Sequence, residues 1–283
     1  MDKGNLGPPA IDRVRLDGRV AVVTGASQGI GFACARRLAA NGCSVVLVGR
    51  TAHTLHEAER LLSSEGYHAK SIACDVCELD TFASLINGLD QLNVLVNNAG
   101  GNRPAPFLDV TRDDFDRLVD LNVRSAFFGS QAALRRMIQL GAKGSIINMS
   151  SQMGHVGSPR RTVYCLTKHA VEGFTKALAL EAARFGVRVN AVAPTFVQTP
   201  MTESYFEDAE FTEFVHSHIP LGRCATAEDV ADAVAFLAQT QRTQSPALVC
   251  EWTADGLRSD LFFDMLNKLP EITTWRETYD QSH

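Results

Sequence analysis

Apolar and polar positions alternate in blocks along the chain. Short apolar, β-branched runs are separated by longer stretches in which apolar residues recur with helical spacing. The short runs are typical of buried strands and the longer stretches of amphipathic helices. We expect seven strands, at 20–25, 44–49, 69–76, 92–100, 144–151, 187–194 and 247–256. We expect helices between them, at 29–42, 52–66, 79–89, 111–141, 162–186 and 226–239.

This order predicts the fold class. Strands that are apolar throughout and separated by helices form a parallel sheet that is covered on both faces. The expected fold is α/β: a single Rossmann-like, doubly wound domain with a mostly seven-stranded parallel sheet and helices on both faces. This catalytic domain spans 18–256, after a flexible extension at 1–17. A lid segment interrupts the last units at about 195–222, and a tail follows at 257–283.

Composition narrows the function classes. The chain has 283 residues, 45 % of them hydrophobic, and a net charge of -5. No basic run appears, which argues against a nucleic-acid partner. No apolar stretch reaches the length of a membrane span, and the first 18 residues lack the apolar core of a secretory signal. The seven cysteines are scattered rather than arranged as a disulfide framework or a zinc site. We therefore expect a cytoplasmic protein with no membrane partner and no metal.

A glycine-rich turn joins the first strand to the first helix. The sequence TGASQGIG at 24–31 places Gly25, Gly29 and Gly31 at this junction. Glycines there allow a tight turn and a close approach of the backbone to a pyrophosphate. The helix N-terminus adds free N–H groups and a favourable dipole. The position between strand and helix predicts a dinucleotide site.

The end of the second strand bears on the choice between NADP(H) and NAD(H). An acidic residue there binds the ribose 2′-hydroxyl, whereas an arginine suits a 2′-phosphate. This strand ends VVLVGRT, with Arg50 and no carboxylate. We favour NADP(H) on this basis. The alternatives are that Arg50 is a solvated loop residue and that the cofactor is NAD(H).

The stretch YCLTK places Tyr164 one helical turn before Lys168. A nearby ammonium favours the phenolate form of a tyrosine and lowers its pKa, so the pair suits proton transfer near neutral pH. The spacing alone is equally compatible with an ordinary helix surface.

Several motifs in order resemble those of the short-chain dehydrogenase/reductase family. They are TGASQGIG at 24–31, DV at 75–76, NNAG at 97–100, Asn122 within LNV, Ser151, and YCLTK at 164–168. Ser151 lies thirteen positions before Tyr164, which is the interval usual in the family. The resemblance covers about residues 18–256 and implies an NAD(P)-dependent enzyme that interconverts a secondary alcohol and a carbonyl.

The resemblance also implies catalytic roles. Tyr164 is the general acid/base, and Lys168 lowers its pKa and binds the nicotinamide ribose. Ser151 orients and polarises the substrate oxygen, with Ser150 as the competing candidate. Asn122 helps to hold a water in a proton relay from Lys168. These roles agree with the chemistry, because hydride transfer to a carbonyl builds negative charge on oxygen, which hydroxyl donors stabilise.

The implied cofactor contacts form a larger set. They are Gly25, Ala26, Ser27, Gln28, Gly29, Ile30, Gly31, Arg50, Asp75, Val76, Asn98, Ala99, Gly100, Tyr164, Lys168, Val197 and Thr199. Two departures from the family pattern bear on this set. Thr195 follows Pro194 where the family commonly has glycine, and Gln28 stands where NADP-preferring members often have a basic residue.

The substrate stays open at this stage. Specificity in the family lies in loops, here 101–107, 152–161 and 196–220. The last is expected to form a lid with Met201, Tyr205, Phe206, Phe211 and Phe214 as apolar contacts. His155, Arg160 and Arg161 are polar groups near the expected pocket. A sugar or polyol, a cyclic ketone and a β-ketoacyl thioester are all compatible.

Other assignments were also weighed. The intact Ser, Tyr and Lys set argues against a lyase or epimerase of the family and against a catalytically silent nucleotide-binding protein. The partner is therefore expected to be a small-molecule alcohol or carbonyl. The apolar helical segments 112–140 and 162–184 predict a homo-oligomer. The family resemblance implies that these helices form a symmetric four-helix interface between subunits, and we therefore expect a homotetramer.

Overall fold

The computed structural model describes most of the chain. The described residues are 15–199, 202, 206–207, 213, 215, 219, 223–239 and the backbone of 249–250. Most of the expected N-terminal extension, most of the expected lid and the whole tail at 257–283 lie outside them. Of the five apolar lid residues only Phe206 is described, and it packs against Val215, Ile219 and Cys224.

The described strands form one parallel sheet of seven strands in the order β3-β2-β1-β4-β5-β6-β7. The strands are β1 Val20–Thr24, β2 Ser44–Gly49, β3 Ala69–Ala73, β4 Val94–Asn97, β5 Ser145–Met149, β6 Arg188–Val192 and β7 Val249–Cys250. The predicted class, a doubly wound α/β fold, is confirmed.

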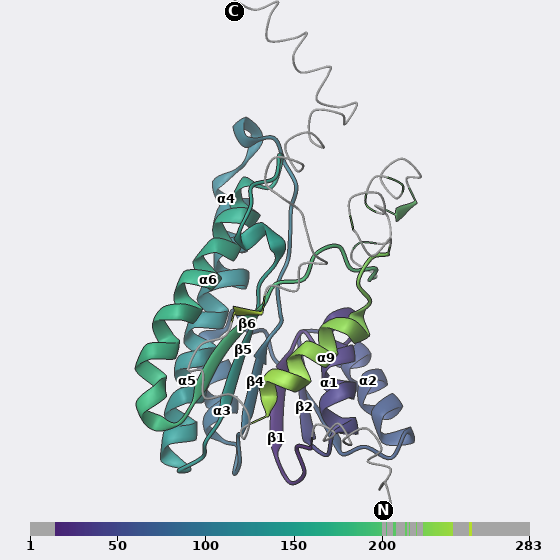
Figure 1. Cartoon of the computed structure of the whole chain (residues 1–283), viewed down its shortest axis with the longest axis vertical. Coiled ribbons are helices and arrows are strands. Elements are labelled where there is room, and N and C mark those ends of the chain that lie inside the picture. The colour runs from purple at the N-terminus through teal and green to yellow at the C-terminus, as the bar shows by residue number, and fades with distance from the viewer. Residues whose placement is uncertain are drawn as a thin grey trace, which may run out of the picture.

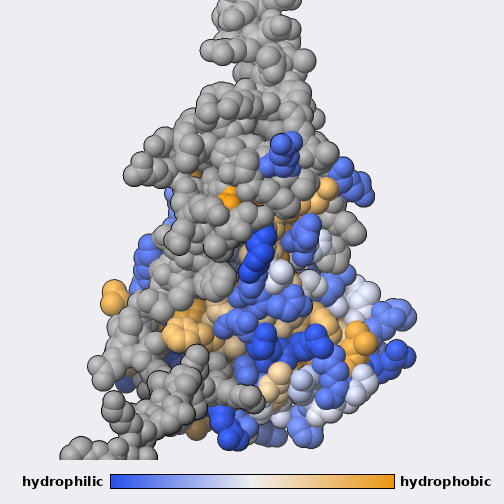
Figure 2. Space-filling view, turned by 45° about the vertical axis from the view of Figure 1, so that its right-hand side comes forward, coloured by the Kyte–Doolittle hydropathy of each residue, from blue (hydrophilic) through white to orange (hydrophobic). Residues whose placement is uncertain are grey.

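Helices cover both faces of this sheet (Figure 1). The helices are α1 Gly29–Ala40, α2 Ala52–Ser64, α3 Leu79–Asn87, α4 Arg112–Val119, α5 Ser125–Gln139, α6 Thr162–Ala182 and α9 Ala227–Ala238. Figure 1 shows α1, α2 and α9 on one side and α3, α5 and α6 on the other. Figure 2 shows that most described side chains on the outward side of α1, α2 and α9 are hydrophilic.

Each layer of helices has its own apolar core. Residues of α1, α2 and α9, such as Leu38, Leu55 and Val234, pack on one face of the sheet. Phe82 of α3 and Met137 of α5 belong to the cluster on the other face. The central strands are buried on both faces, which explains why their sequences are apolar without alternation.

The strand order creates a crevice where the site is expected. The chain runs from β1 outward to β3 and then returns to place β4 beside β1. Loops from the carboxyl ends of β1 and β4 therefore diverge, and ligands of such sheets bind in the opening between them.

Several predicted segments are longer than the elements observed, and two of the differences bear on the site. The expected third strand, 69–76, ends at Ala73, because pairing with β2 stops at the Gly49–Ala73 position. Residues 74–76 then leave the sheet and line the crevice. The expected helix at 111–141 begins with Thr111, whose hydroxyl accepts a hydrogen bond from the Asp114 N–H at 3.1 Å. It is interrupted by a π-helical turn, Asp120–Arg124.

Candidate active site

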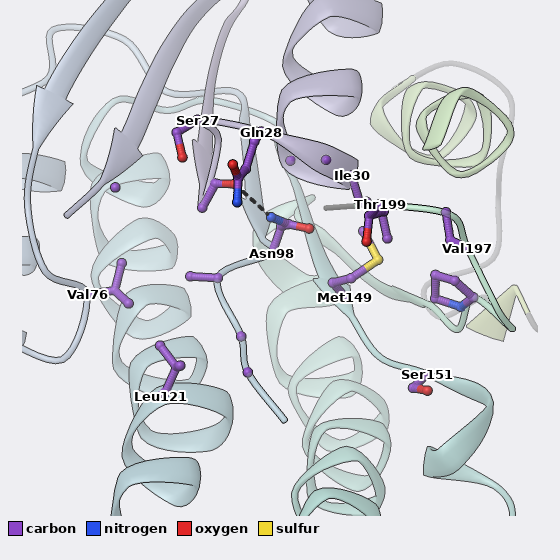
Figure 3. Close-up of a pocket in the computed structure, with 18 of the residues that line it drawn as sticks. Ser27, Gln28, Ile30, Val76, Asn98, Leu121, Met149, Ser151, Val197 and Thr199 are labelled. Carbon is purple, nitrogen blue, oxygen red and sulfur yellow. Dashed lines mark hydrogen bonds between the residues drawn. The ribbon is translucent and has the colours of Figure 1, made fainter. Parts of the chain in front are cut away.

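A cavity of about 480 Å³ opens at the carboxyl ends of the strands. The cavity is lined by residues of the glycine turn, the end of β2, the loop after β4, β5 with the loop after it, α6 and the loop after β6. Of the predicted site residues, fifteen that precede β6 are among them: Gly25, Ser27, Gln28, Gly29, Ile30, Gly31, Arg50, Asp75, Val76, Asn98, Ala99, Gly100, Ser151, Tyr164 and Lys168. Val197 and Thr199 line it as well. Figure 3 shows ten lining residues by name, with Ser151 well apart from Ser27 and Gln28.

The glycine turn is shaped by close backbone contact. Gly25 and Gly29 have φ values of 63° and 56°, in the left-handed region that glycine tolerates best. A Cβ on Gly31 would lie 2.2 Å from the carbonyl oxygen of Gly25. Ala26 is fully buried beneath the turn and does not line the cavity, so its predicted contact with cofactor is not seen in the lining. The turn is a cradle that side chains would fill.

The first helix presents its N-terminus to this cradle. Gln28 is the N-cap residue, but its side chain makes no capping hydrogen bond, and the first turn holds no acidic residue. The first N–H groups of a helix lack intrahelical partners and attract anions. This helix end therefore fits a pyrophosphate.

The loop after β4 is pinned to the glycine turn. The Thr24 hydroxyl accepts from the N–H groups of Asn98 and Ala99, each at 3.0 Å. The Asn98 side-chain amide donates to the carbonyls of Thr24 and Gly25 at 2.9 and 3.2 Å. Figure 3 shows Asn98 directed toward the turn. The two sides of the crevice are therefore held at a fixed separation.

Arg50 stands on the rim next to the turn. It is exposed, lines the cavity, and forms no ion pair with any residue that the structure describes. Thr51 and Thr54 line the same region and were missed by the sequence analysis. The available signal was the presence of two threonines within the four positions after Arg50. A guanidinium with neighbouring hydroxyls suits a phosphate monoester.

Ser151 and Tyr164 line the opposite end of the cavity. Ser151 begins a 3-10 turn, Gln152–Gly154, and its hydroxyl accepts from the Met153 N–H at 3.2 Å. Burial raises the pKa of Tyr164, while a hydrogen bond with Ser151 and the charge of Arg161 oppose this shift. The net direction is opposite to the one expected from Lys168. The physical reason is that the phenol is desolvated and Arg161 is the cation that acts on it.

Lys168 is buried close to this phenol. Its ammonium lies 5.5 Å from the centre of the Tyr164 ring and donates to the Met149 carbonyl at 2.7 Å. Burial lowers the pKa of Lys168 to about 8, and the charge of Glu172 opposes the shift. Tyr164 and Lys168 therefore lie close together as predicted, but desolvation is the main cause of the pKa shift of each group.

Asn122 does not line the cavity, and its side chain is fully occupied. Its amide oxygen accepts from the Gly101 N–H at 2.8 Å, and its amide group donates to the Gly101 carbonyl at 2.9 Å and to Thr167 at 3.1 Å. Asn122 lies in the π-helical turn, a type of distortion that is frequent at functional sites. Its side chain thus fixes the loop after β4 against α6.

Other lining residues were not among the predicted catalytic and cofactor-binding residues. They are Gly49, Cys74, Gly101, Leu121, Met149, Ser150, Pro194, Thr195 and Thr202, with Thr51 and Thr54 named above. Most of them directly flank predicted residues, so their neighbours were the signal. Ser150, which lines the cavity as well, was considered only as a competitor of Ser151.

The residues present fit a nicotinamide dinucleotide. The glycine cradle and the bare helix N-terminus suit its pyrophosphate. Thr195 lines the cavity, and its buried hydroxyl oxygen has no hydrogen-bond partner among the described residues. The described residues contain no cluster of His, Cys, Asp and Glu suited to a metal ion.

Comparisons with known proteins agree with this geometry. A family model described as enoyl-(acyl carrier protein) reductase matches residues 25–244. Gluconate 5-dehydrogenase of Gluconobacter oxydans is 37 % identical over 230 residues, which cover 80 % of this chain and 90 % of that protein. L-xylulose reductase of Bos taurus is 38 % identical over 224 residues, which cover 79 % and 90 %.

A solved structure matches in both fold and sequence. It is a gluconate 5-dehydrogenase from Burkholderia cenocepacia in complex with NADP and tartrate. Its TM-score is 0.80 at 32 % identity, and the match covers 85 % of this chain and 96 % of that one. The predicted NAD(P)-dependent oxidoreductase acting on alcohol or carbonyl groups is confirmed, and NADP is the cofactor recorded in the solved relative. The chain belongs to the short-chain dehydrogenase/reductase family.

Proposed function

We propose that the protein reduces a carbonyl group of a small polyhydroxylated compound to a secondary alcohol with NADPH, and catalyses the reverse reaction with NADP⁺. One observation carries this proposal. Ser151, Tyr164 and Lys168 line the same cavity as the glycine turn and Arg50. A hydride carrier held by the turn would thus extend to the hydroxyl groups of Ser151 and Tyr164.

Tyr164 is the general acid in the reductive direction. When bound, the nicotinamide supplies the hydride. The Tyr164 hydroxyl donates its proton to the carbonyl oxygen as negative charge develops there. The Ser151 hydroxyl donates a second hydrogen bond to the same oxygen and stabilises this charge. Because burial raises the pKa of Tyr164, the phenol carries its proton at neutral pH, as reduction requires.

Lys168 and Asn122 support this step. The Lys168 ammonium would exchange its bond to Met149 for the nicotinamide ribose, and it places a positive charge near Tyr164. Since the Asn122 side chain is occupied, its part in a proton relay falls to its main-chain carbonyl at the π-helical turn, where the regular helical hydrogen-bond pattern is broken.

Arg50 selects NADP(H). It has no ion partner among the described residues, and hydroxyl groups stand beside it. A carboxylate that would bind a free 2′-hydroxyl is absent from the end of β2.

The substrate class rests on the relatives and on the site. Gluconate 5-dehydrogenase and L-xylulose reductase act, by name, on a sugar acid and on a sugar. Thr195 and Thr202 add two hydroxyl residues to the lining of the cavity that holds Ser151 and Tyr164. Hydroxyl side chains of this kind bind a polyol better than a long acyl chain.

The assembly is proposed to be a homotetramer. Apolar side chains remain exposed on α5 and α6: Phe127 is 43 % exposed, Leu166 49 % and Leu180 74 %. The rings of Phe127 and Phe174 pack together at 5.1 Å on this side. Such apolar surface is typical of a subunit interface. Light scattering at micromolar concentration should give four subunits, and a monomer would contradict the proposal.

A cytoplasmic location completes the proposal. All six described cysteines are free thiols. This is typical of a reducing compartment. No described helix is long and apolar enough to cross a membrane.

A carbonyl screen tests the reaction. Nicotinamide absorbance is followed with NADPH or NADH while ketoses, keto sugar acids, cyclic ketones and β-ketoacyl thioesters are offered. We expect turnover of the sugar compounds with NADPH. Ser151→Ala should lose most of its kcat, whereas Ser150→Ala, a matched change in the same cavity, should lose little. Absence of turnover with every carbonyl and alcohol would overturn the proposal.

A further inference from the structure

A buried carboxylate lies next to the catalytic residues and is not used by the mechanism above. Glu172 is on α6, one helical turn after Lys168, and its side chain is only 5 % exposed. Neither of its oxygens has a hydrogen-bond partner among the residues that the structure describes. A buried carboxylate is costly unless a cation compensates it.

The compensating groups come from two elements. The Nε2 atom of His155, in the loop that follows Ser151, lies 3.3 Å from the Oε1 atom of Glu172. Lys168 lies one helical turn before Glu172 on the same helix, and the negative charge of the carboxylate raises the pKa of Lys168. These are the charged or titratable groups that the structure records facing Glu172. The Glu172 carboxylate therefore has Lys168 on its own helix and His155 of the 152–161 loop as its neighbours.

The backbone between Ser151 and His155 is tight and follows the helix closely. The Gly154 N–H donates to the Ser151 carbonyl at 2.8 Å, and the His155 N–H donates to the Gln152 carbonyl at 2.9 Å. A Cβ on Gly154 would lie 3.0 Å from both the Lys168 carbonyl oxygen and the Glu172 Cγ. The turn that carries Ser151 is thus pressed directly on the helix that carries Tyr164 and Lys168.

We infer that Glu172 and His155 form a positioning pair, which anchors the Ser151 turn to α6 and provides the negative neighbour of the Lys168 ammonium. This inference rests on the proposed function, because it gives the pair a purpose only if Ser151 and Lys168 act as described. Packing alone does not require a charge there, since an apolar side chain of similar volume is often neutral or stabilising in place of a buried ion pair.

The pair makes a specific prediction for cofactor binding. Glu172 raises the pKa of Lys168, against the larger effect of burial. Glu172→Gln removes that charge with little change of shape, so Lys168 should lose its proton at lower pH. NADPH affinity, measured by fluorescence titration from neutral to alkaline pH, should then decline about 0.5–1 pH unit earlier than in the wild type.

Two controls isolate this effect. Glu181→Gln makes the same change at an exposed position of the same helix and should leave the pH dependence of NADPH affinity unchanged. A merely structural role of Glu172 would lower the melting temperature without moving the pH dependence. A folded Glu172→Gln variant that titrates like the wild type and like Glu181→Gln would overturn the inference.

A second variant tests the role of the pair if Glu172→Gln fails to fold. His155→Gln loosens the anchor from the other side and should lower kcat about tenfold through a displaced Ser151, with NADPH affinity at neutral pH retained. The matched control is His169→Gln, at an exposed position of α6. An unchanged kcat in His155→Gln would overturn the inference. If the wild type turns over no substrate, the proposed function fails, while NADPH affinity against pH still tests the pair.

Discussion

The two ends of the cavity differ in whether backbone or side-chain groups form them. The nucleotide end consists of backbone: glycines at positive φ, a bare helix N-terminus and a carbonyl that lies where a Cβ on Gly31 would be. The catalytic end consists of side chains, of which Lys168 is 5 % and Ser151 9 % exposed and Tyr164 is half-buried. The first end is fixed by shape and does not titrate, whereas the second depends on protonation. The two ends should therefore fail in different ways when they are changed.

Tyr164→Phe should have the largest effect, and only on the catalytic end. Loss of the proton donor is expected to lower kcat about 10²–10⁴-fold, which is the usual contribution of general acid–base catalysis. NADPH affinity should survive, because the glycine turn is untouched. Steady-state kinetics and fluorescence titration measure the two quantities. Tyr67→Phe, which changes a tyrosine outside the cavity lining, is the matched control. A Tyr164→Phe variant with most of its kcat would remove Tyr164 from the proton-transfer role.

Gly31→Ala should damage the nucleotide end by sterics. Its Cβ would lie 2.2 Å from the Gly25 carbonyl oxygen, which is backbone and cannot swing away. We expect at least about 10²-fold weaker NADPH binding and a loss of stability of about 1–3 kcal/mol, as is typical of overpacking. Calorimetry and thermal melting would show both.

Gly173→Ala on α6 provides the matched control for this change. No atom lies within 4 Å of its added Cβ, so it should stabilise the protein slightly and leave binding alone. Equal NADPH affinity in the Gly31→Ala and Gly173→Ala variants would contradict the claim that the close backbone contact at Gly31 is needed for nucleotide binding.

Arg50→Asp should exchange the cofactor preference without affecting the chemistry. Loss of a charge-assisted contact to the 2′-phosphate, with a carboxylate in its place, should weaken NADP(H) binding about 10–100-fold and favour NAD(H). The ratio of kcat/KM for the two cofactors measures this change. Arg60→Asp on the outer side of α2 should leave the ratio unchanged. A wild-type protein that prefers NAD(H) would contradict the role given to Arg50.

The pH dependence should show the smallest effect. Since the pKa of Lys168 is lowered to about 8, NADPH affinity should fall about tenfold between one unit below and one unit above that value. Stability should respond in the opposite direction. Between pH 8 and 10.5 the unfolded chain binds this proton and the folded chain does not, so this group's contribution to stability rises with pH. Lys168→Met should lack both dependences, and a wild-type profile in that variant would assign them to other groups.

The sequence predicted the nucleotide end better than the electrostatics of the catalytic end. Glycine spacing between a strand and a helix is a local pattern, so the turn and its partners at 97–100 could be placed without coordinates. The direction of the Tyr164 pKa shift could not, because burial in the folded protein raises this pKa and Arg161, not Lys168, is the cation that opposes the rise. The His155–Glu172 contact joins residues seventeen positions apart on different elements, and no periodicity marks it. The partners of the Asn122 side chain could not be predicted for a similar reason, since Gly101 and Thr167 meet that amide only in the folded protein.

Deuterium transfer tests whether NADPH delivers a hydride to the carbonyl carbon of the substrate. The full-length protein is given NADPH that carries deuterium at the transferable position of the nicotinamide, together with a ketose or keto sugar acid. Mass spectrometry then locates the label. If NADPH is the hydride donor, deuterium should appear on the carbon of the newly formed secondary alcohol, both with the wild type and in the residual turnover of Tyr164→Phe. Alcohol product without deuterium on that carbon, or a product formed without consumption of NADPH, would contradict it.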